Sequence, residues 1–431
     1  MLATFGFATM LVFLGLIMWK KMSVLTALVL TPVAFGLLAG FTPKELGEFA
    51  LAGIRQVAPT GILLMFAVLY FATMLDAGLF DPVIALIIRS VHGDPLKVIV
   101  GTAVLTMIVH LDGDGTATFM IVLSAFLPVY KELKINPLVL SCIVALSVGP
   151  MHLVPWSGTS ARAMSTLQSD ATHIFNPNIP AILGGIGWVL LVAYWLGKKE
   201  RKRLGIIHFR YSHHENLTDR QQQLRRPRLI WVNALFTALL ILTLMSGWIP
   251  APVLFVVASM VALLINYPRL ADQQAVVKSH AANIFLVSSM IFTAGIFSGI
   301  LTGSKMIEEM ANSLVRLIPE QHANFLPVLT ALTSVPASII FTPDAYYFGV
   351  VPILSETATQ FGIDPLEIGR AALLGQMTVG FPISPLVAST YLLIGMAEVD
   401  LAEHQRFTFK WALGTTFVMT IVALLTGSIH L

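Results

Sequence analysis

The sequence predicts an all-α polytopic membrane protein built from two inverted-topology repeats. Each repeat is expected to hold five transmembrane helices, one of them broken, and one re-entrant helical hairpin. Three observations carry this prediction: a strongly apolar composition, apolar runs of membrane-spanning length, and short motifs that recur at a nearly constant distance along the chain.

The composition is that of a chain that lies mostly in lipid. Of its 431 residues, 56% are hydrophobic and only 11% are charged, whereas soluble domains carry about 25% charged residues. Cys142 is the only cysteine, which rules out a disulfide framework. No basic residue precedes the first apolar run, and Lys20 and Lys21 follow it, so we expect an uncleaved anchor that starts outside.

Only helices and closed barrels span a bilayer, and the apolar runs here are too long and continuous for barrel strands. A helix needs about 17–25 residues to cross. Ten segments meet this requirement, namely residues 2–19, 22–41, 60–78, 137–168, 179–197, 229–247, 250–266, 284–302, 365–396 and 411–429. Five of them lie in each half of the chain.

Two further apolar segments, residues 98–129 and 324–359, are predicted to be re-entrant hairpins. The motif DGDG (112–115) interrupts the first, and TPD (342–344) interrupts the second. About a dozen apolar residues precede the first interruption, which is roughly 18 Å of helix. This is well short of a hydrocarbon core of about 30 Å, so a segment that enters and leaves on one side fits better than a full span.

The basic residues support this layout. With both termini outside, 20 Lys and Arg residues fall in cytoplasmic loops and 4 in outside loops, as the positive-inside rule requires. Half of the cytoplasmic ones lie in residues 198–228, predicted to be a linker between the first repeat (1–197) and the second (229–431). Attraction of this linker to anionic membrane lipids is a secondary possibility. We expect a multi-pass protein of the bacterial inner (cytoplasmic) membrane.

Short motifs relate the two halves. INPL (135–138) recurs as IDPL (363–366), and PWS (155–157) recurs as PIS (382–384), at offsets of 228 and 227 residues. Amphipathic stretches are expected outside at 43–57 and 304–317 and inside at 81–91 and 268–283. Because five spans are an odd number, the second half must run upside down, and inverted repeats with discontinuous helices are typical of secondary transporters.

The tip of the first hairpin is the first candidate site. Asp112 and Asp114 place two carboxylates at mid-membrane depth, where a charge costs at least about 2.5–3.5 kcal/mol and therefore indicates a function. Carboxylates bind protons and hard cations. Gly113 and Gly115 let the backbone approach a ligand, and together with Thr116 they are predicted to contact the substrate.

Alternatives stay open at both hairpin tips. Asp114 is also a candidate N-cap for the following helix, and Asp344, its counterpart at the second tip, is either a substrate-binding residue or a similar cap. His110 is either a proton site or a hydrogen-bonded strut. His152, which precedes the break of the next helix, is grouped with His110 as a proton- or cation-coupling residue.

Residues 149–162 form the second candidate element, because helix-breaking residues and a run of hydroxyls interrupt one apolar span. Ser157 is the expected N-cap of the half-helix that follows, whose free N–H groups at Gly158 and Thr159 suit an anion. Arg162, about one turn further on, is predicted to pair with a substrate carboxylate. The alternative is that its side chain snorkels to the outer interface.

GFPISP (380–385) is the mirror element in the second half. Ser384 is the expected substrate-binding cap there, and Pro385 suits the first helical position. Two hairpin tips and two half-helix ends are therefore expected to converge. A polycarboxylate accompanied by a cation satisfies both the anion-binding N-termini and the cation-binding carboxylates.

At these residues the sequence resembles the citrate–metal–proton symporter (CitMHS) family of the ion transporter superfamily. The similarity runs over essentially the whole chain, and the segment HLDGDGTATF (110–119) is quite specific to the family. The other matching segments are LPVYKELKINPLVL (127–140), MHLVPWSGTSARA (151–163), TPDAYYFGVVPIL (342–354) and GFPISPLVAS (380–389).

The resemblance implies proton-coupled import of citrate complexed to Mg²⁺ or Ca²⁺, with no tightly bound cofactor. Asp112 and Asp114 would contact the metal of the metal–citrate complex. The superfamily fold implies a homodimer and an elevator mechanism, in which a transport domain with both hairpins and both broken helices moves against a scaffold of early spans. The Ser-Asn-Thr tips of the sodium-coupled dicarboxylate branch are absent, which favours proton coupling.

Other functions differ from this one in ways that the sequence or a simple assay addresses. Transport of another di- or tricarboxylate without metal stays open. An intramembrane aspartyl protease would carry a Gly-x-Gly-Asp pattern, which is missing, so no enzyme is expected. No G-x-x-x-x-G-K-[ST] motif supports a nucleotide-driven pump, and no nucleic-acid partner is expected. A channel would differ from a carrier by failing to show counterflow.

Overall fold

The computed structural model describes residues 1–19, 21–90, 93–206, 219–316 and 318–431. Within these ranges every regular element is a helix and no strand is present. Seven helical stretches are long and apolar enough to cross a membrane: Pro43–Asp76, Pro95–Asp112, Ala171–Leu204, Pro227–Ser246, Leu270–Gly303, Gln321–Ile340 and Leu401–Leu425. The predicted class, an all-α multi-pass membrane protein, is confirmed.

The first half of the chain holds twelve helical elements in the described residues. They are α1 (Leu2–Met18), α2 (Val24–Leu38), α3 (Pro43–Asp76), α4 (Asp81–Ser90), α5 (Pro95–Val109), η1 (His110–Asp112), α6 (Gly115–Glu132), α7 (Pro137–Met151), α8 (Gly158–Thr166), α9 (Ala171–Ile174), η2 (Asn176–Asn178) and α10 (Ile179–Leu204). The predicted linker at 198–228 therefore begins as helix, because α10 continues to Leu204. Its residues 207–218 lie outside the described part.

The second half follows a similar order of helices. It comprises α11 (Asp219–Leu224), η3 (Pro227–Leu229), α12 (Ile230–Ser246), α13 (Ala251–Asn266), α14 (Leu270–Gly303), α15 (Met306–Val315), η4 (Glu320–Phe325), α16 (Leu326–Ile340), α17 (Pro343–Ala345), the π-helix η5 (Tyr346–Val350), α18 (Val351–Gln360), α19 (Pro365–Ile383), α20 (Ala388–Ala397) and α21 (Leu401–Leu425). The four helices α1 to α4 have 17, 15, 34 and 10 residues, and α12 to α15 have 17, 16, 34 and 10.

Two expected amphipathic stretches are not separate elements. Residues 43–57 form the first half of α3, and residues 270–283 form the beginning of α14. Thr42 and Glu45 build a capping box that starts α3 early, with Thr42 Oγ1 accepting from the Glu45 N–H and the Glu45 carboxylate accepting from the Thr42 N–H. Pro59 lies within α3 without ending it, as membrane helices tolerate.

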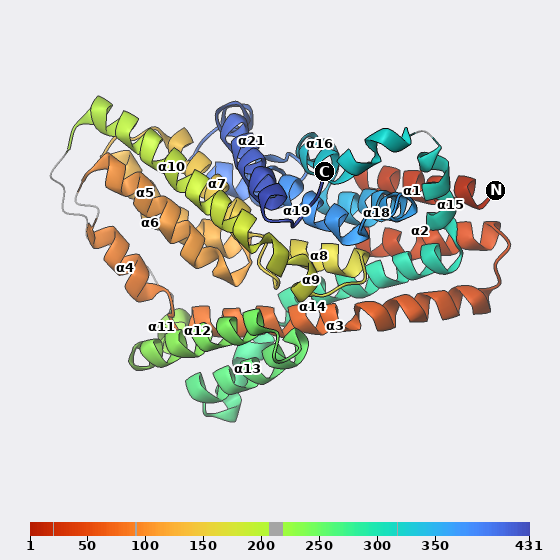
Figure 1. Ribbon diagram of the computed structural model, residues 1–431. Coiled ribbons are helices and arrows are strands. Elements are labelled where there is room, and N and C mark those ends of the chain that lie inside the picture. Colours follow the sequence, from red (N-terminus) through yellow and green to blue (C-terminus); the bar gives the residue numbers. More distant parts are fainter. Residues whose placement is uncertain (20, 91–92, 207–218, 317) are drawn as a thin grey trace.

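Helices α3 and α14 pack against each other along their length (Figure 1). Gly295, Gly299 and Gly303 follow a four-residue spacing on α14, and a Cβ atom on Gly53 of α3 would lie 1.9 Å from the Gly295 carbonyl oxygen. Small residues at this spacing let membrane helices approach closely. Near the other end of the pair, His280 Nε2 lies 2.9 Å from Asp76 Oδ2. The two long helices are thus joined at both ends.

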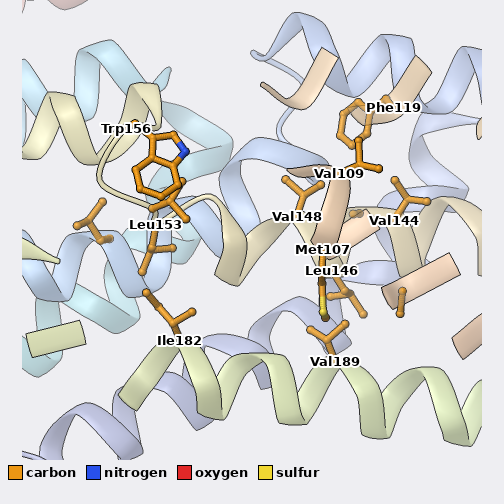
Figure 2. Packing of buried hydrophobic residues seen from close by; sticks show 14 of the residues in the cluster. Met107, Val109, Phe119, Val144, Leu146, Val148, Leu153, Trp156, Ile182 and Val189 are labelled. Atoms are coloured by element: carbon orange, nitrogen blue, oxygen red, sulfur yellow. The ribbon is translucent and has the colours of Figure 1, made fainter. Parts of the chain in front are cut away.

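The hairpin of α5 and α6 packs on α7 in the interior of the molecule. Figure 2 shows Val109 and Phe119 of the hairpin beside Val144 and Val148 of α7, with Val189 of α10 nearby. Residues 139–150 of α7 are all buried. A helix that is apolar all round is a core helix, so the break that follows α7 is held from several sides.

Candidate functional site

The first hairpin turns at Gly113. Helix α5 ends at Val109, a 3₁₀ turn follows, and Gly113 adopts φ +78°, a left-handed conformation that favours glycine. Asp114 is the N-cap of α6, since its Oδ1 accepts from the Thr116 N–H at 2.8 Å. Asp112 Oδ1 accepts from the Asp114 N–H at 2.9 Å. Capping by Asp114 is confirmed, and it uses one oxygen of the carboxylate.

The break between α7 and α8 lies directly against this tip. Ser157 is the N-cap of α8, as predicted, and its Oγ accepts from the Ser160 N–H at 3.2 Å. The indole N–H of Trp156 donates to the Leu111 carbonyl at 2.7 Å. A Cβ atom on Gly113 would lie 3.3 Å from the Ser157 Cα. The tip and the break therefore form one unit, which requires glycine at its closest approach.

His110 and His152 form a buried pair behind the tip. His110 Nε2 lies 2.7 Å from His152 Nδ1, and the two rings stack with centroids 4.9 Å apart. The other nitrogen of His110, Nδ1, lies 2.9 Å from Thr118 Oγ1. An imidazole–imidazole hydrogen bond needs one protonated nitrogen and one lone pair. His110 is thus hydrogen-bonded as a strut would be, in a pair whose protonation states depend on each other.

A cavity of about 370 Å³ joins the tip, the break and the two long helices. The tip and break contribute Asp112, Gly113, Asp114, Gly115, Thr116, Ala117, His152, Trp156 and Gly158. The opposite wall comes from Val68, Phe71, Ala72 and Leu75 of α3 and from His280, Asn283 and Val287 of α14. Seven predicted site residues therefore share one cavity.

The second hairpin tip is built differently. Thr342 is the N-cap of α17, with its Oγ1 accepting from the Ala345 N–H at 3.2 Å, so the alternative in which Asp344 caps this helix is wrong. Asp344 Oδ1 instead lies 2.5 Å from Arg162 Nε. The side chains of Arg162 and Asp344 are only 21% and 14% exposed, which also excludes snorkelling of Arg162 to the interface.

Arg162 belongs to the wall behind the cavity. Its Nη1 donates to the Gly158 carbonyl at 2.8 Å, and Gly158 itself lines the cavity. The ion pair with Asp344 therefore links the second hairpin to the first break. Beyond Asp344 the chain forms the π-helix Tyr346–Val350, a conformation that is rare and frequently found at functional sites.

The second break departs from the prediction. Helix α19 ends at Ile383 and α20 begins at Ala388, whose N-cap, Val387, makes no side-chain capping bond. Ser384 is buried, and its Oγ accepts from the Leu386 N–H at 3.2 Å. Ser384 is therefore not a cap: it closes a local serine turn, which delays the helix by four residues. The side chains of residues 376–382 lie outside the described part.

Comparison with known proteins identifies the family. Residues 14–375 match the citrate transporter family, CitMHS. The chain belongs to this citrate transporter family. It is 52% identical over 429 residues to the citrate transporter of Bacillus subtilis (strain 168), and both chains are covered completely. It is 49% identical over 433 residues to that organism's Mg²⁺/citrate complex secondary transporter, again with complete coverage of both. The chain is thus a secondary transporter and not an enzyme.

A solved structure shares the fold of this citrate transporter family member. The crystal structure of the Alcanivorax borkumensis YdaH transporter, described as having an unusual topology, aligns with a TM-score of 0.65 over 89% of each chain. The sequences are only 14% identical, so the likeness concerns the fold alone.

Two buried hydroxyl groups near the ion pair have no hydrogen-bond partner among the described residues. They are Thr159 Oγ1, in the first turn of α8, and Tyr347 Oη, on the π-helix that contacts α8. Buried polar atoms without a partner are uncommon and call for an explanation. Both hydroxyl groups are therefore candidates for contact with a ligand between α8 and the second tip. Thr159 was predicted from the sequence, whereas Tyr347 was not.

Several functional candidates were missed because the sequence carries no local signal for them. His280 and Asn283 stand in a polar stretch that resembles a surface segment, yet they line the cavity. In the described part of the chain no group of three or more His, Cys, Asp or Glu side chains forms a metal site. Any divalent metal would therefore meet only Asp112 and Asp114 as acidic ligands from the cavity wall.

Proposed function

We propose that this transporter imports citrate as a complex with Mg²⁺ or Ca²⁺, coupled to protons. The observation that carries the proposal is the 370 Å³ cavity, which Asp112 and Asp114 line together with Gly158 at the N-terminus of α8. A metal–citrate complex has a cationic and an anionic side, and this cavity offers a group for each. The relative named as an Mg²⁺/citrate complex transporter supports the same substrate.

The cationic side of the complex would meet the first hairpin tip. Mg²⁺ and Ca²⁺ prefer oxygen ligands, and Mg²⁺ keeps several of its waters and part of its substrate shell. Asp112 and Asp114 each use Oδ1 for a backbone hydrogen bond. Because a carboxylate has two oxygens and about four acceptor sites, both residues retain capacity for a metal that arrives with citrate. Gly113, Gly115 and Thr116 complete this side through their backbone.

The anionic side would meet α8 and Arg162. The free N–H groups of Gly158 and Thr159 suit a carboxylate, and the Arg162 guanidinium lies beside Gly158. We propose that the Asp344 carboxylate occupies the place of a substrate carboxylate beside Arg162. A citrate carboxylate would then displace Asp344 on binding. Ser384 is the proposed contribution of the second break, through its turn and not as a cap.

Protons would be carried by the groups that adjoin the metal. His110 and His152 share a hydrogen bond in which one ring accepts, so a change at His152, which lines the cavity, alters His110 behind it. Asp112 and Asp114 are the other coupling candidates. In a symporter, proton binding and metal–citrate binding must favour each other, and the position of His152, Asp112 and Asp114 in one cavity is the proposed basis of that coupling.

The two similar halves are the basis for assigning a scaffold and a transport domain. The matching helix lengths of α1–α4 and α12–α15 and the recurring motifs support inverted repeats over 1–197 and 229–431. We propose that α1–α4 and α12–α15 form the scaffold, and that the hairpins and broken helices form the transport domain of an elevator. A homodimer and external termini, in the bacterial inner membrane, belong to the same proposal.

Citrate uptake into proteoliposomes tests the function. Labelled citrate is offered under an imposed pH gradient, inside alkaline, with and without Mg²⁺ or Ca²⁺. Uptake that needs both the gradient and the metal is expected. Uptake that does not depend on metal would mean that the substrate is free citrate. Uptake that does not depend on the pH gradient would contradict proton coupling. Counterflow of labelled against unlabelled citrate separates this carrier from a channel.

A further inference from the structure

A second polar cleft lies far from the helix breaks. It has a volume of about 700 Å³ and lies where α6 and α10 end, α7 begins and α20 ends. Helices α6, α7 and α10 lie side by side in this region (Figure 1). The charged residues that line it are four basic ones, Lys131, Lys134, Lys199 and Arg203, and two acidic ones, Glu200 and Glu398.

Both acidic side chains of this cleft already form ion pairs. Lys131 Nζ lies 2.6 Å from Glu398 Oε1, and Arg203 Nη2 lies 2.5 Å from Glu200 Oε2. Among the described residues no carboxylate lies within 4.0 Å of Lys134 or Lys199. The cleft therefore carries two ammonium groups without an acidic partner in the described part of the chain, and it attracts an anion.

The wall of the cleft is held in place by hydrogen bonds of Glu200 and Arg203. Glu200 is only 8% exposed at its side chain and accepts from the Asn136 N–H at 3.4 Å. Arg203 donates a second hydrogen bond, 2.9 Å long, to the carbonyl of Lys134. Lys134 has φ +55°, a conformation that non-glycine residues adopt rarely. Helix α10 thus fixes the backbone turn that carries Lys134, so the backbone needs little ordering when a ligand binds.

The surface next to the cleft is apolar and aromatic. On α10, one to two turns before Lys199, Leu191 is 64% exposed and Trp195 is 51% exposed. The Trp195 ring lies 5.2 Å from that of Trp411, and Lys199 Nζ lies 5.9 Å from the Trp195 centroid. An exposed tryptophan close to a lysine is typical of the membrane–water interface. A ligand here meets cations at one end and an apolar surface at the other.

We propose that this cleft binds the phosphate of an anionic phospholipid through Lys134 and Lys199, with an acyl chain along Leu191 and Trp195. Basic pockets between membrane helices on the cytoplasmic side bind anionic head groups. A free phosphate would satisfy the two lysines but not the apolar surface, so lipid is the better match. This lipid site is inferred from the cleft and the apolar surface beside it, and not from the proposed function.

The test measures thermal unfolding of the purified full-length protein in detergent with added phosphatidylglycerol, phosphatidylcholine or inorganic phosphate. Only phosphatidylglycerol is expected to raise the unfolding temperature. The Lys134→Gln and Lys199→Gln variants are expected to bind it roughly fivefold more weakly each. Lys97→Gln, an exposed lysine on α5 outside the cleft, is the matched control and should behave as the unaltered protein.

Native mass spectrometry of the same variants counts bound phosphatidylglycerol directly and does not depend on unfolding. Equal stabilisation by phosphatidylcholine, or full phosphatidylglycerol binding in both variants, overturns the proposal. Stabilisation by inorganic phosphate alone, lost in the variants, would assign the site to a soluble anion and overturn the lipid assignment.

Discussion

The two halves of this transporter build their breaks from similar helices but place different chemistry in them. The first tip carries two carboxylates, and its break ends at Ser157, which caps α8 six residues after α7 ends. The second tip carries one carboxylate, already bound to Arg162, and its break restarts without a side-chain cap. The first half thus holds acidic groups lining the cavity, and the second half supplies a partner for the first half's arginine.

This difference bears on the roles proposed for the two tips. A site made of two identical halves would treat the cation and the anion alike, whereas the asymmetry of the two tips is consistent with the proposal that each has its own side. Asp112 and Asp114 line the cavity, while Asp344 reaches across to a helix of the other half. The following predictions test this division, in order of decreasing effect.

Asp112→Asn and Asp114→Asn are each expected to reduce gradient-driven citrate uptake by about 100-fold or more, since a desolvated charged contact in the site is lost. Asparagine caps a helix as well as aspartate does, so Asp114→Asn removes the charge and leaves the cap. Asp170→Asn, at another capping aspartate in an exposed loop, is the control. Normal uptake in both tip variants would reduce these residues to caps.

Arg162→Ala and Asp344→Asn are expected to act in opposite directions on citrate affinity. Loss of Arg162 should raise the KM for citrate by about 10- to 100-fold, since a charged hydrogen bond contributes about 1.5–3 kcal/mol. Asp344→Asn should tighten citrate binding by about tenfold, because the competing carboxylate is gone, while lowering thermal stability. Citrate uptake at graded concentrations gives the KM of Arg162→Ala, and isothermal titration with citrate and Mg²⁺ gives the affinity of Asp344→Asn. A purely structural ion pair would leave the Asp344→Asn affinity unchanged.

His110→Gln and His152→Gln are expected to lower uptake driven by the pH gradient by about tenfold and to leave citrate counterflow within about twofold, as one general proton-transfer group contributes at least this much. The contrast arises because counterflow needs no net proton movement. Parallel measurement in proteoliposomes gives both rates. If the two rates fall together, the pair is a strut and not a proton carrier.

Ser157→Ala and Ser384→Ala are expected to have the smallest effects, and the two variants should lower the free energy of unfolding by different amounts. Removal of the Ser157 cap should lower the free energy of unfolding by about 1 kcal/mol. Ser384→Ala loses a turn hydrogen bond but no helix cap, so its loss should be smaller, about 0.5 kcal/mol. Urea unfolding in detergent compares the two, and equal losses would mean that the second break is capped as the first is.

The features that the sequence predicts are those with a local cause. Glycines and aspartates inside an apolar run locate the first tip, and Ser157 ahead of a polar half-helix locates the first cap. The lengths of α3 and α14 could not be predicted from local patterns, because each helix includes a stretch that looks amphipathic and was expected to be a separate element. The Arg162–Asp344 pair joins residues 182 positions apart, and a single sequence contains no local signal for such a contact. The serine turn at Ser384 was missed because Ser-Pro also begins many helices.

The joined pair α3–α14 has a consequence for how the cavity opens. Its backbones meet at Gly53 and Gly295, where no side chain separates them, and Asp76 and His280 hold the other end. The two helices that supply one wall of the cavity therefore form a single rigid plate. We therefore expect the room that citrate needs to enter or leave to come from displacement of the opposite wall, the tip and break, with this plate as the fixed reference for that motion.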